Sequence, residues 1–278
     1  MTYSIVGYDP EAKEWGIAVQ SKFIGVGAVV PFAKAGVGAV ATQSYANTSY
    51  GPQALQLMEE GKTAEEALEL ITKDDPERHL RQVGLLDAMG NPATFTGEGC
   101  YDWAGGITGP NFAAQGNILV GENTVHAMGE IFTSTEGPLA HRLLTALDAG
   151  QSAGGDSRGM QSAALLVVKE QGGYGGFNDW YIDVRVDDHP DPIKELIRIY
   201  KLHRLYFAES ETGRVVLIEG EVAEELEREL FRLGYRDKKK SLQQSLKDYL
   251  HTENFEMREQ EENMIDLDVL DFMKNQRE

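Results

Sequence analysis

The order of strand-like and helix-like segments constrains the fold of this chain more than any other feature. In the first 200 residues, several short apolar runs typical of β-strands precede two helical patterns. More strand-like runs, a second pair of helical patterns and two final strand-like runs follow. Parallel strands need a long crossover between them, usually a single helix. Helices that arrive in pairs therefore favour two sheets stacked between helical layers.

The segments carry recognisable start and stop signals. The strand-like runs cover residues 2–9, 15–21, 23–30, 37–44, 81–98, 111–121, 162–170 and 180–188, and a Met-Gly-Asn-Pro turn divides 81–98. The helical patterns cover residues 49–61, 63–75, 125–134 and 138–150. Thr63 and Glu66 have the spacing of a capping box at the start of the second helix, and Gly61 stands where a helix C-cap is expected. We predict an α+β fold.

Glycine content changes sharply near residue 200. Residues 1–199 contain 27 of the 30 glycines, whereas the remaining 79 residues contain 3. The second part is also denser in charge, and its helical patterns cover residues 221–235, 241–255 and 265–276. We therefore predict two domains, 1–200 and 201–278, the second being small and helical.

One helical pattern crosses that boundary. It covers residues 191–207, with Asp191 as its cap and Pro192 in its first turn. The boundary between the domains is therefore expected within or beside a helix.

The chain is strongly acidic. It has 26 Lys and Arg residues against 45 Asp and Glu residues, a net charge of -19. Such a field repels phosphate backbones and anionic lipids, so we expect neither a nucleic acid nor a membrane as partner. No run approaches the roughly 18 apolar residues that span a bilayer, and the start of the chain has no signal-peptide pattern. We expect a cytoplasmic location.

Metal and disulfide chemistry have little support in the sequence. Cys100 is the only cysteine, so it has no intrachain disulfide partner and cannot build a cysteine cluster. The six histidines are scattered, without an H-x-H or H-E-x-x-H pattern. We predict no metal and no cofactor.

The glycine-flanked loop at residues 154–159 has two interpretations. Its sequence GGDSRG could bind an anion through backbone N–H groups and Arg158, with Asp156 beside them. It could equally be a tight turn between a helix and a strand.

Thr2 stands directly after the initiator methionine, at the start of the first strand-like run. Methionine is normally removed before a residue as small as threonine. An N-terminal threonine can attack a carbonyl through its hydroxyl, while its own amine, with an ordinary pKa of about 7.7–8.0, accepts the proton. The alternative is that Thr2 is only the first residue of a strand.

Several motifs in the first domain together resemble the DUF1028 family, which is placed in the N-terminal nucleophile (Ntn) hydrolase superfamily. They are TYSIV, GIAVQSKF, GVGAVATQSYANTSYGP, RQVGLLDA, AAQGNILVG, GGDSRGMQSAALLVV and DVRVDDHPDPI, in order over roughly residues 1–200. The resemblance implies a four-layer αββα sandwich and places Thr2 where an Ntn nucleophile stands. The implied activity is hydrolysis of an amide C–N bond in a small molecule or a peptide-like substrate.

The resemblance also suggests roles for polar residues near that nucleophile. A basic residue lowers the pKa of the attacking residue's amine in proteasome-like relatives, and Lys22 and Lys34 are the candidates here. The alternative for either one is an ordinary surface lysine. The oxyanion needs aligned donors, and four polar residues interrupt apolar strand runs where donors can sit: Gln20, Ser21, Gln43 and Asn117. Hydrogen bonding between the sheets is the alternative role for these four residues.

Residues 205–211, 220–235, 241–258 and 265–274 resemble a peptidoglycan-binding module found at the C-terminus of some DUF1028 proteins. Such modules are small helical bundles, and the resemblance implies a peptidoglycan fragment (muropeptide) as ligand. A packing, dimerising or substrate-covering role is the alternative. Hydrophobic strands at a sheet edge make a homodimer reasonable. A non-catalytic protein that holds a ligand on the same fold is the competing hypothesis to hydrolysis.

Overall fold

The computed structural model describes residues 2–237 and 239–276, which form two compact units. The division falls between Ile197 and Arg198, inside helix α5 (Pro192–Phe207). The first unit is an α+β fold built on two antiparallel sheets. The family resemblance and the order of the segments both predicted this coarse class.

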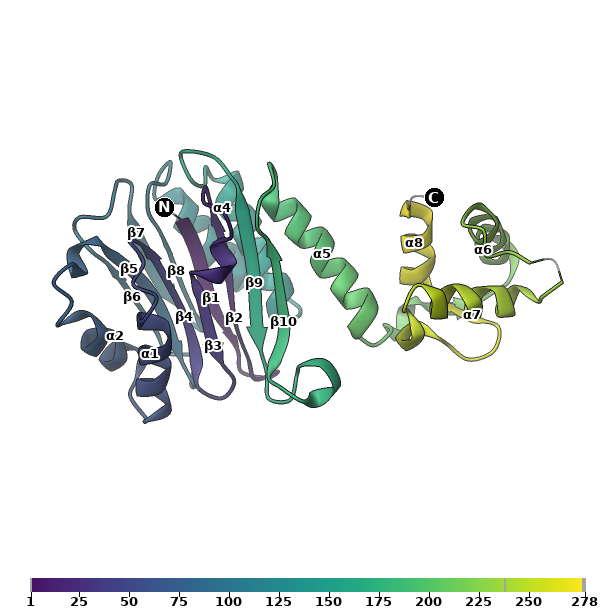
Figure 1. Cartoon of the computed structure of the whole chain (residues 1–278), viewed down its shortest axis with the longest axis horizontal. Helices are drawn as coiled ribbons and strands as arrows, with labels where there is room; N and C mark the ends of the chain where they lie inside the picture. Colours follow the sequence, from purple (N-terminus) through teal and green to yellow (C-terminus); the bar gives the residue numbers. More distant parts are fainter. Residues whose placement is uncertain (1, 238, 277–278) are drawn as a thin grey trace. The chain divides into compact units, whose positions relative to one another are not determined.

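The larger sheet has six strands in the order β10-β9-β2-β1-β8-β7 (Figure 1). Their bounds are β1 Thr2–Asp9, β2 Glu14–Ser21, β7 Gly105–Gly109, β8 Phe112–Gly116, β9 Ser162–Val168 and β10 Trp180–Val186. The two central strands form the predicted N-terminal hairpin, in which Thr2 pairs with Ser21 and Asp9 pairs with Glu14. The first residue of β1 therefore lies at one end of the sheet, beside the last residue of β2.

The smaller sheet has the order β3-β4-β5-β6, with β3 Pro31–Lys34, β4 Gly38–Ser44, β5 Arg81–Asp87 and β6 Pro92–Thr96. The strand predicted over 23–30 is wrong. A short 3-10 turn, Val26–Ala28, occupies that region because Gly25 has a left-handed φ of 62°. Gly27 packs so closely that an added Cβ would lie 2.6 Å from the Ala164 side chain. β3 therefore begins only at Pro31.

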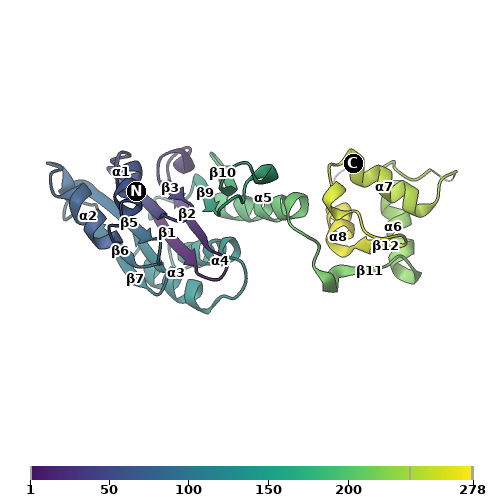
Figure 2. The same cartoon turned by 90° about the horizontal axis from the view of Figure 1, so that it is seen from below.

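Two pairs of helices cover the sheets. α1 (Tyr50–Glu59) and α2 (Ala64–Thr72) contact the smaller sheet, whereas α3 (Asn123–Ser134) and α4 (Leu139–Ser152) contact the larger one. Figure 2 shows α1 on one side of the strands and α3 and α4 on the other. The predicted capping box starts α2, with the Glu66 N–H donating to Thr63 Oγ1 at 3.2 Å. The two sheets contact each other between these helix pairs.

Alternation along the strands divides the apolar residues between separate cores. Val6, Ile17 and Val19 of the larger sheet share a buried cluster with Ala39 and Ala41 of the smaller one. A second cluster joins the other face of the smaller sheet to α1 and α2. At the end of the sheets where β1 begins, polar residues replace the apolar ones between the sheets.

The second unit is helical with a small β-ladder. It contains residues 198–207 of α5 together with α6 (Gly220–Arg232), α7 (Leu242–Thr252) and α8 (Leu267–Asn275), and β11 (Val215–Leu217) pairs with β12 (Met264–Asp266). Its own core is built around Leu226, Tyr249 and Phe255. In the described part of both units, no helix has the length and apolar character needed to cross a bilayer.

Candidate functional site

Six polar side chains fill the space between the sheets at the end where β1 begins. They are Thr2, Ser4, Gln43, Gln82, Gln115 and Asn117, all 0–5% exposed. We call this group the inter-sheet polar cluster. Thr2 and Ser4 come from β1, Gln115 and Asn117 from β8 and the residue after it, and Gln43 and Gln82 from β4 and β5. Buried polar groups are costly unless they are hydrogen-bonded, so this cluster needs a compensating network.

Gln82 is the centre of that network. Its side-chain oxygen accepts hydrogen bonds from Gln43 Nε2 at 2.9 Å and from Asn117 Nδ2 at 2.7 Å. Its own Nε2 donates to the Gly116 carbonyl at 2.7 Å and to Thr96 Oγ1 at 2.9 Å. The Gln82 amide thus orients the amides of Gln43, from the smaller sheet, and Asn117, from the larger sheet, beside Thr2.

Thr2 is held by its carbonyl oxygen. This oxygen accepts from the Asn117 backbone N–H at 3.1 Å, from Gln43 Nε2 at 3.3 Å and from Asn117 Nδ2 at 3.4 Å. The Thr2 hydroxyl donates to Ser21 Oγ at 3.0 Å. The predicted removal of Met1 concerns residue 1, which lies outside the described residues.

A second set of bonds continues the cluster inward. Ser4 Oγ donates to Gln43 Oε1 and accepts from Gln115 Nε2, each at 2.7 Å. The Gln115 amide lies against Gly84 on β5, where an added Cβ would collide with the amide oxygen. A glycine at residue 84 is therefore required for the two sheets to share this amide.

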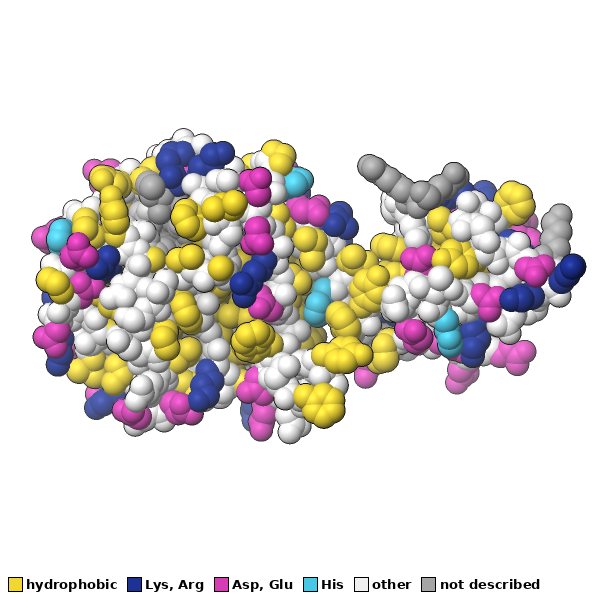
Figure 3. All heavy atoms as spheres, viewed as in Figure 1, with side chains coloured by type: hydrophobic (Ala, Val, Ile, Leu, Met, Phe, Trp, Pro, Cys, Tyr) yellow, Lys and Arg dark blue, Asp and Glu magenta, His cyan; other side chains and the backbone are white. Residues whose placement is uncertain are grey.

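Two tyrosines stand beside the cluster at the surface. Tyr45 comes two residues after Gln43, and the Tyr101 carbonyl accepts from the N–H of Ile118, the residue after Asn117. Their hydroxyls are 3.4 Å apart and each side chain is about half exposed. The hydrogen bond with Tyr101 raises the pKa of Tyr45. Figure 3 shows hydrophobic and basic side chains together at this end of the first unit.

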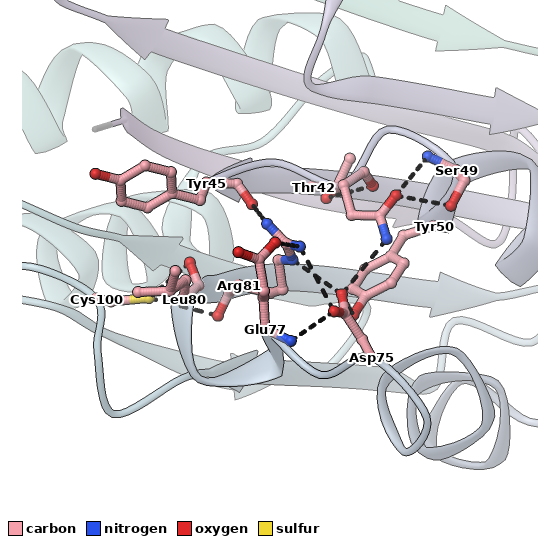
Figure 4. A network of polar contacts seen from close by, with 10 residues as sticks. Thr42, Tyr45, Ser49, Tyr50, Asp75, Glu77, Leu80, Arg81 and Cys100 are labelled. Atoms are coloured by element: carbon pink, nitrogen blue, oxygen red, sulfur yellow. Dashed lines mark hydrogen bonds and ion pairs between the residues drawn. The ribbon is translucent and has the colours of Figure 1, made fainter.

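An ion-pair network supports the backbone that carries Tyr45. Arg81 Nη1 donates to the Tyr45 carbonyl at 2.8 Å, while Arg81 Nε donates to Asp75 Oδ2 at 2.9 Å (Figure 4). Asp75 also accepts from the Tyr50 hydroxyl at 2.7 Å. Hydrogen bonding to Arg81 holds the pKa of Asp75 well below its ordinary value, and burial raises the pKa of Tyr50. Asp75 and Tyr50 also line an open groove of about 540 Å³ beside α1 and α2.

Three of the residues predicted near the nucleophile lie beside Thr2: Ser21, Gln43 and Asn117. The NH₂ groups of the two amides donate to Gln82 and to backbone carbonyls, including that of Thr2. The hydrogen bonding between sheets that the sequence left as an alternative is therefore present.

The ammonium groups of the two lysines have hydrogen-bond partners other than Thr2. Lys34 pairs with Gly38 at the other end of β4, five residues and roughly 16 Å along the strand from Gln43, and its ammonium binds Glu59. The Lys22 ammonium donates to the Met160 carbonyl at 3.1 Å. Met160 leads into β9, which is the neighbour of β2 on the side away from β1.

The side chain of Gln20 lies on the opposite face of the larger sheet from that of Thr2. Gln20 precedes Ser21 and pairs with Tyr3, so its side chain lies on the face that carries α4, where Tyr3 donates to Gln151 at 2.9 Å. Both amide atoms of Gln20 are buried without a hydrogen-bond partner among the described residues. This position does not fit the predicted donor to an oxyanion on Thr2.

The loop at 154–159 is a turn whose polar groups are used internally. Asp156 accepts from the Lys22 backbone N–H at 3.2 Å, from the Arg158 N–H at 3.0 Å and from Arg158 Nη2 at 2.7 Å. The Gly155, Ser157 and Gly159 N–H groups donate to nearby backbone carbonyls. These contacts agree with the alternative prediction of a tight turn, in which Arg158 is paired with Asp156.

Sequence reasoning missed Ser4, Gln82 and Gln115, although each is a polar residue in an apolar strand run, the same signal that identified Gln43. It also missed the pairing of Asp75 with Arg81, which depends on tertiary contacts. Among the described residues, no group of three or more His, Cys, Asp or Glu side chains is arranged to hold a metal ion.

Comparison with known families assigns both units. Residues 2–196 match the model described as "Family of unknown function (DUF1028)", and residues 206–273 match the one described as "Putative peptidoglycan binding domain". The crystal structure of protein SPO2555 from Silicibacter pomeroyi, also described by the DUF1028 model, is 30% identical, with a TM-score of 0.67 over 80% of this chain and 92% of that one. This chain belongs to the DUF1028 family, as its motifs predicted.

Two structures of Anbu are more distant. An Anbu (Gly-1) mutant from Hyphomicrobium sp. strain MC1 is 12% identical, with a TM-score of 0.36 over 76% of this chain and 99% of that one. Anbu (ancestral beta-subunit) from Yersinia bercovieri is 10% identical, with a TM-score of 0.33 over 71% of this chain and 92% of that one. No curated protein matches this chain in sequence.

Proposed function

We propose that the first unit is an αββα sandwich of the Ntn-hydrolase type and that it cleaves an amide bond with Thr2 as nucleophile. The observation that carries this proposal is the setting of Thr2. It begins β1, it is 5% exposed, and three N–H groups bind its carbonyl oxygen while its hydroxyl stays within 3.0 Å of Ser21. This is more anchoring than the first residue of a strand needs.

The proposed reaction has two steps. After removal of Met1, Thr2 Oγ1 attacks the substrate carbonyl carbon and its proton passes to the α-amine of Thr2. Collapse of the tetrahedral adduct breaks the C–N bond, the leaving amine takes that proton, and an ester forms on Thr2. Water then hydrolyses the ester, which releases the carboxylic acid and restores the hydroxyl.

The neighbouring side chains have distinct roles in this proposal. Ser21 orients the Thr2 hydroxyl across the hairpin. Gln43 and Asn117 are positioning residues that fix the carbonyl of Thr2 and hence its place in the cluster. Neither Lys22 nor Lys34 is assigned a role, because their ammonium groups bind the Met160 carbonyl and Glu59 rather than Thr2.

The test uses untagged protein in three forms: unchanged, Thr2→Ser and Thr2→Val. All three begin with a small second residue, so each should lose Met1, which intact mass measures. A β-lactone, which acylates N-terminal nucleophiles, should add one adduct to the unchanged protein and to Thr2→Ser, mapped to the N-terminal peptide. Thr2→Val should gain none. Retained Met1, or equal labelling of Thr2→Val, would overturn the nucleophile.

The same three proteins then enter a screen of amides, ureides and γ-glutamyl compounds. For any substrate found, Thr2→Val should lower kcat/KM at least about a thousandfold, whereas Thr2→Ser should stay within about tenfold. Equal turnover by Thr2→Val would contradict the proposal.

We propose a separate binding role for the second unit, which is supported by the match of residues 206–273 to the peptidoglycan-binding description. The ligand would be peptidoglycan or a fragment of it. Sedimentation of the full chain with purified insoluble peptidoglycan tests this role. Failure to sediment would remove it without affecting the chemistry proposed at Thr2.

A further inference from the structure

The second unit contains a groove of about 670 Å³. One wall is the 198–207 part of α5, with Lys201 and Arg204, and the other is α8, with Asp271 and Asn275. Leu202 and Phe272, which pack on the core of this unit, contribute apolar surface. This volume is in the range of about 300–1,000 Å³ that is usual for small-ligand sites.

The walls of the groove are held by a buried ion pair. Arg258 is 2% exposed, and its Nη1 donates to Asp266 Oδ2 at 2.7 Å. Its other nitrogens donate to the Leu205 and Arg204 carbonyls at the end of α5, at 2.9 and 2.5 Å. A cation is favourable at this position, beside carbonyls of the last helical turn. The basic wall is therefore attached to the core of its own unit.

The charges in the groove are unequally compensated. The two acidic side chains of α8, Asp268 and Asp271, both bind Arg214, at 2.8 and 2.6 Å. Arg204 binds Glu211 at 2.9 Å. Lys201 is exposed, and no ion pair joins it to a carboxylate of the described residues. An uncompensated cation beside apolar surface is a local site for an anionic group, although the chain as a whole is acidic.

We propose that this groove binds a short peptide that carries carboxylate groups, with one carboxylate on Lys201 and aliphatic side chains on Leu202 and Phe272. This inference deepens the binding role proposed for the second unit, because the stem peptide of peptidoglycan has this chemistry. The sugar of a peptidoglycan fragment is not required by the groove.

The experiment is calorimetric titration of the full chain with four probes. They are the tetrapeptide L-alanyl-γ-D-glutamyl-meso-diaminopimelyl-D-alanine, the same peptide with its carboxylates converted to amides, the disaccharide that carries this peptide, and the disaccharide alone. We expect the tetrapeptide and the disaccharide that carries it to bind. The amidated tetrapeptide should bind at least about tenfold more weakly. Binding of the disaccharide alone with equal affinity would overturn the proposal.

Charge reversal in the protein provides the matched test. Lys201→Glu should weaken tetrapeptide binding about fivefold or more and flatten its salt dependence. Lys239→Glu makes the same change at another exposed lysine of this unit, outside the groove, and should alter the affinity less than twofold. Thermal melting checks that both variants fold. Equal affinity of the two variants would overturn the assignment of the groove.

Sedimentation separates this inference from the binding role on which it rests. If the full chain and Lys201→Glu sediment equally with peptidoglycan, the groove assignment fails and the binding role stands. If the tetrapeptide binds with the expected dependence on Lys201 but the chain does not sediment, the groove assignment stands and binding to the polymer fails.

Discussion

The side-chain amide of Asn117 donates to the side-chain oxygen of Gln82 at 2.7 Å, and this bond joins the two sheets next to Thr2. Asn117 is 1% and Gln82 0% exposed, so neither can exchange its partner for water. The geometry of the candidate site therefore depends on Gln82, which is not hydrogen-bonded to Thr2 itself.

Gln82→Met should destabilise the first unit by about 2–4 kcal/mol. The substitution keeps the volume but removes the oxygen that accepts from Gln43 and Asn117, so both buried amides lose their shortest hydrogen bond. It also removes the NH₂ group that donates to the Gly116 carbonyl. Urea denaturation followed by tryptophan fluorescence measures the change, because all three tryptophans lie in this unit. Gln53→Met, on the exposed side of α1, is the control and should change stability by less than about 0.5 kcal/mol. Equal effects of the two substitutions would contradict the network.

Gly84 and Gln115 should be energetically coupled. Gly84→Ala pushes a Cβ into the Gln115 amide, which is fixed by Ser4 at 2.7 Å, and should cost about 1–3 kcal/mol. In a Gln115→Ala background that collision is absent, so the same glycine substitution should cost little. A double-mutant cycle in urea measures the difference, and strictly additive effects would show that the close approach is unimportant.

The sequence predicted most elements of the first unit because local signals were strong. The hairpin of Thr2–Asp9 with Glu14–Ser21 and the capped helix at Ala64 follow from alternation and capping residues. It missed the Gly105–Gly109 strand, where four glycines or small polar residues give no apolar pattern, and it missed the short β11–β12 ladder. For the site, the sequence identified polar residues in apolar strands but not the face of the sheet on which each side chain lies. Gln20 and Gln43 give the same signal, and only the strand pairing shows that Gln20 lies on the helix-facing side.

Stability should depend on Asp75 mainly above about pH 4. Hydrogen bonds with Arg81 lower the pKa of Asp75 in the folded state below the unfolded value of roughly 3.9. A lowered folded pKa gives stability that is complete above the unfolded value and is lost as the pH falls toward the folded value. The difference in unfolding free energy between the unchanged protein and Asp75→Asn should therefore be constant from pH 7 to 5 and shrink below pH 4.

Asp74→Asn is the matched control, since Asp74 is exposed and adjacent. Its effect on unfolding by urea should be small at each of pH 7, 5, 4 and 3. A stability difference for Asp75→Asn that grows toward acid would show that the ion pair with Arg81 does not stabilise the fold.

Arg258→Met should destabilise the second unit by about 3–5 kcal/mol and leave the first unit unchanged. The substitution leaves the fully buried carboxylate of Asp266 without its ion-pair partner. It also removes the hydrogen bond to the Leu205 carbonyl at the end of α5. Arg258→Lys keeps the charge but cannot reach all three acceptors, so its effect should be intermediate. Hydrogen exchange measures protection in residues 208–276, and the tryptophan transition reports the first unit. A shift of that transition by Arg258→Met would show that the units unfold together.

The anchoring of Thr2 by its carbonyl has a consequence for protein maturation. The hydrogen bonds described for this residue use its carbonyl and its hydroxyl, with Asn117, Gln43 and Ser21 as partners. Excision of a preceding methionine would therefore break none of them. Under the proposed chemistry, removal of that methionine by an aminopeptidase would expose the α-amine of Thr2 while its carbonyl and hydroxyl keep the same hydrogen bonds.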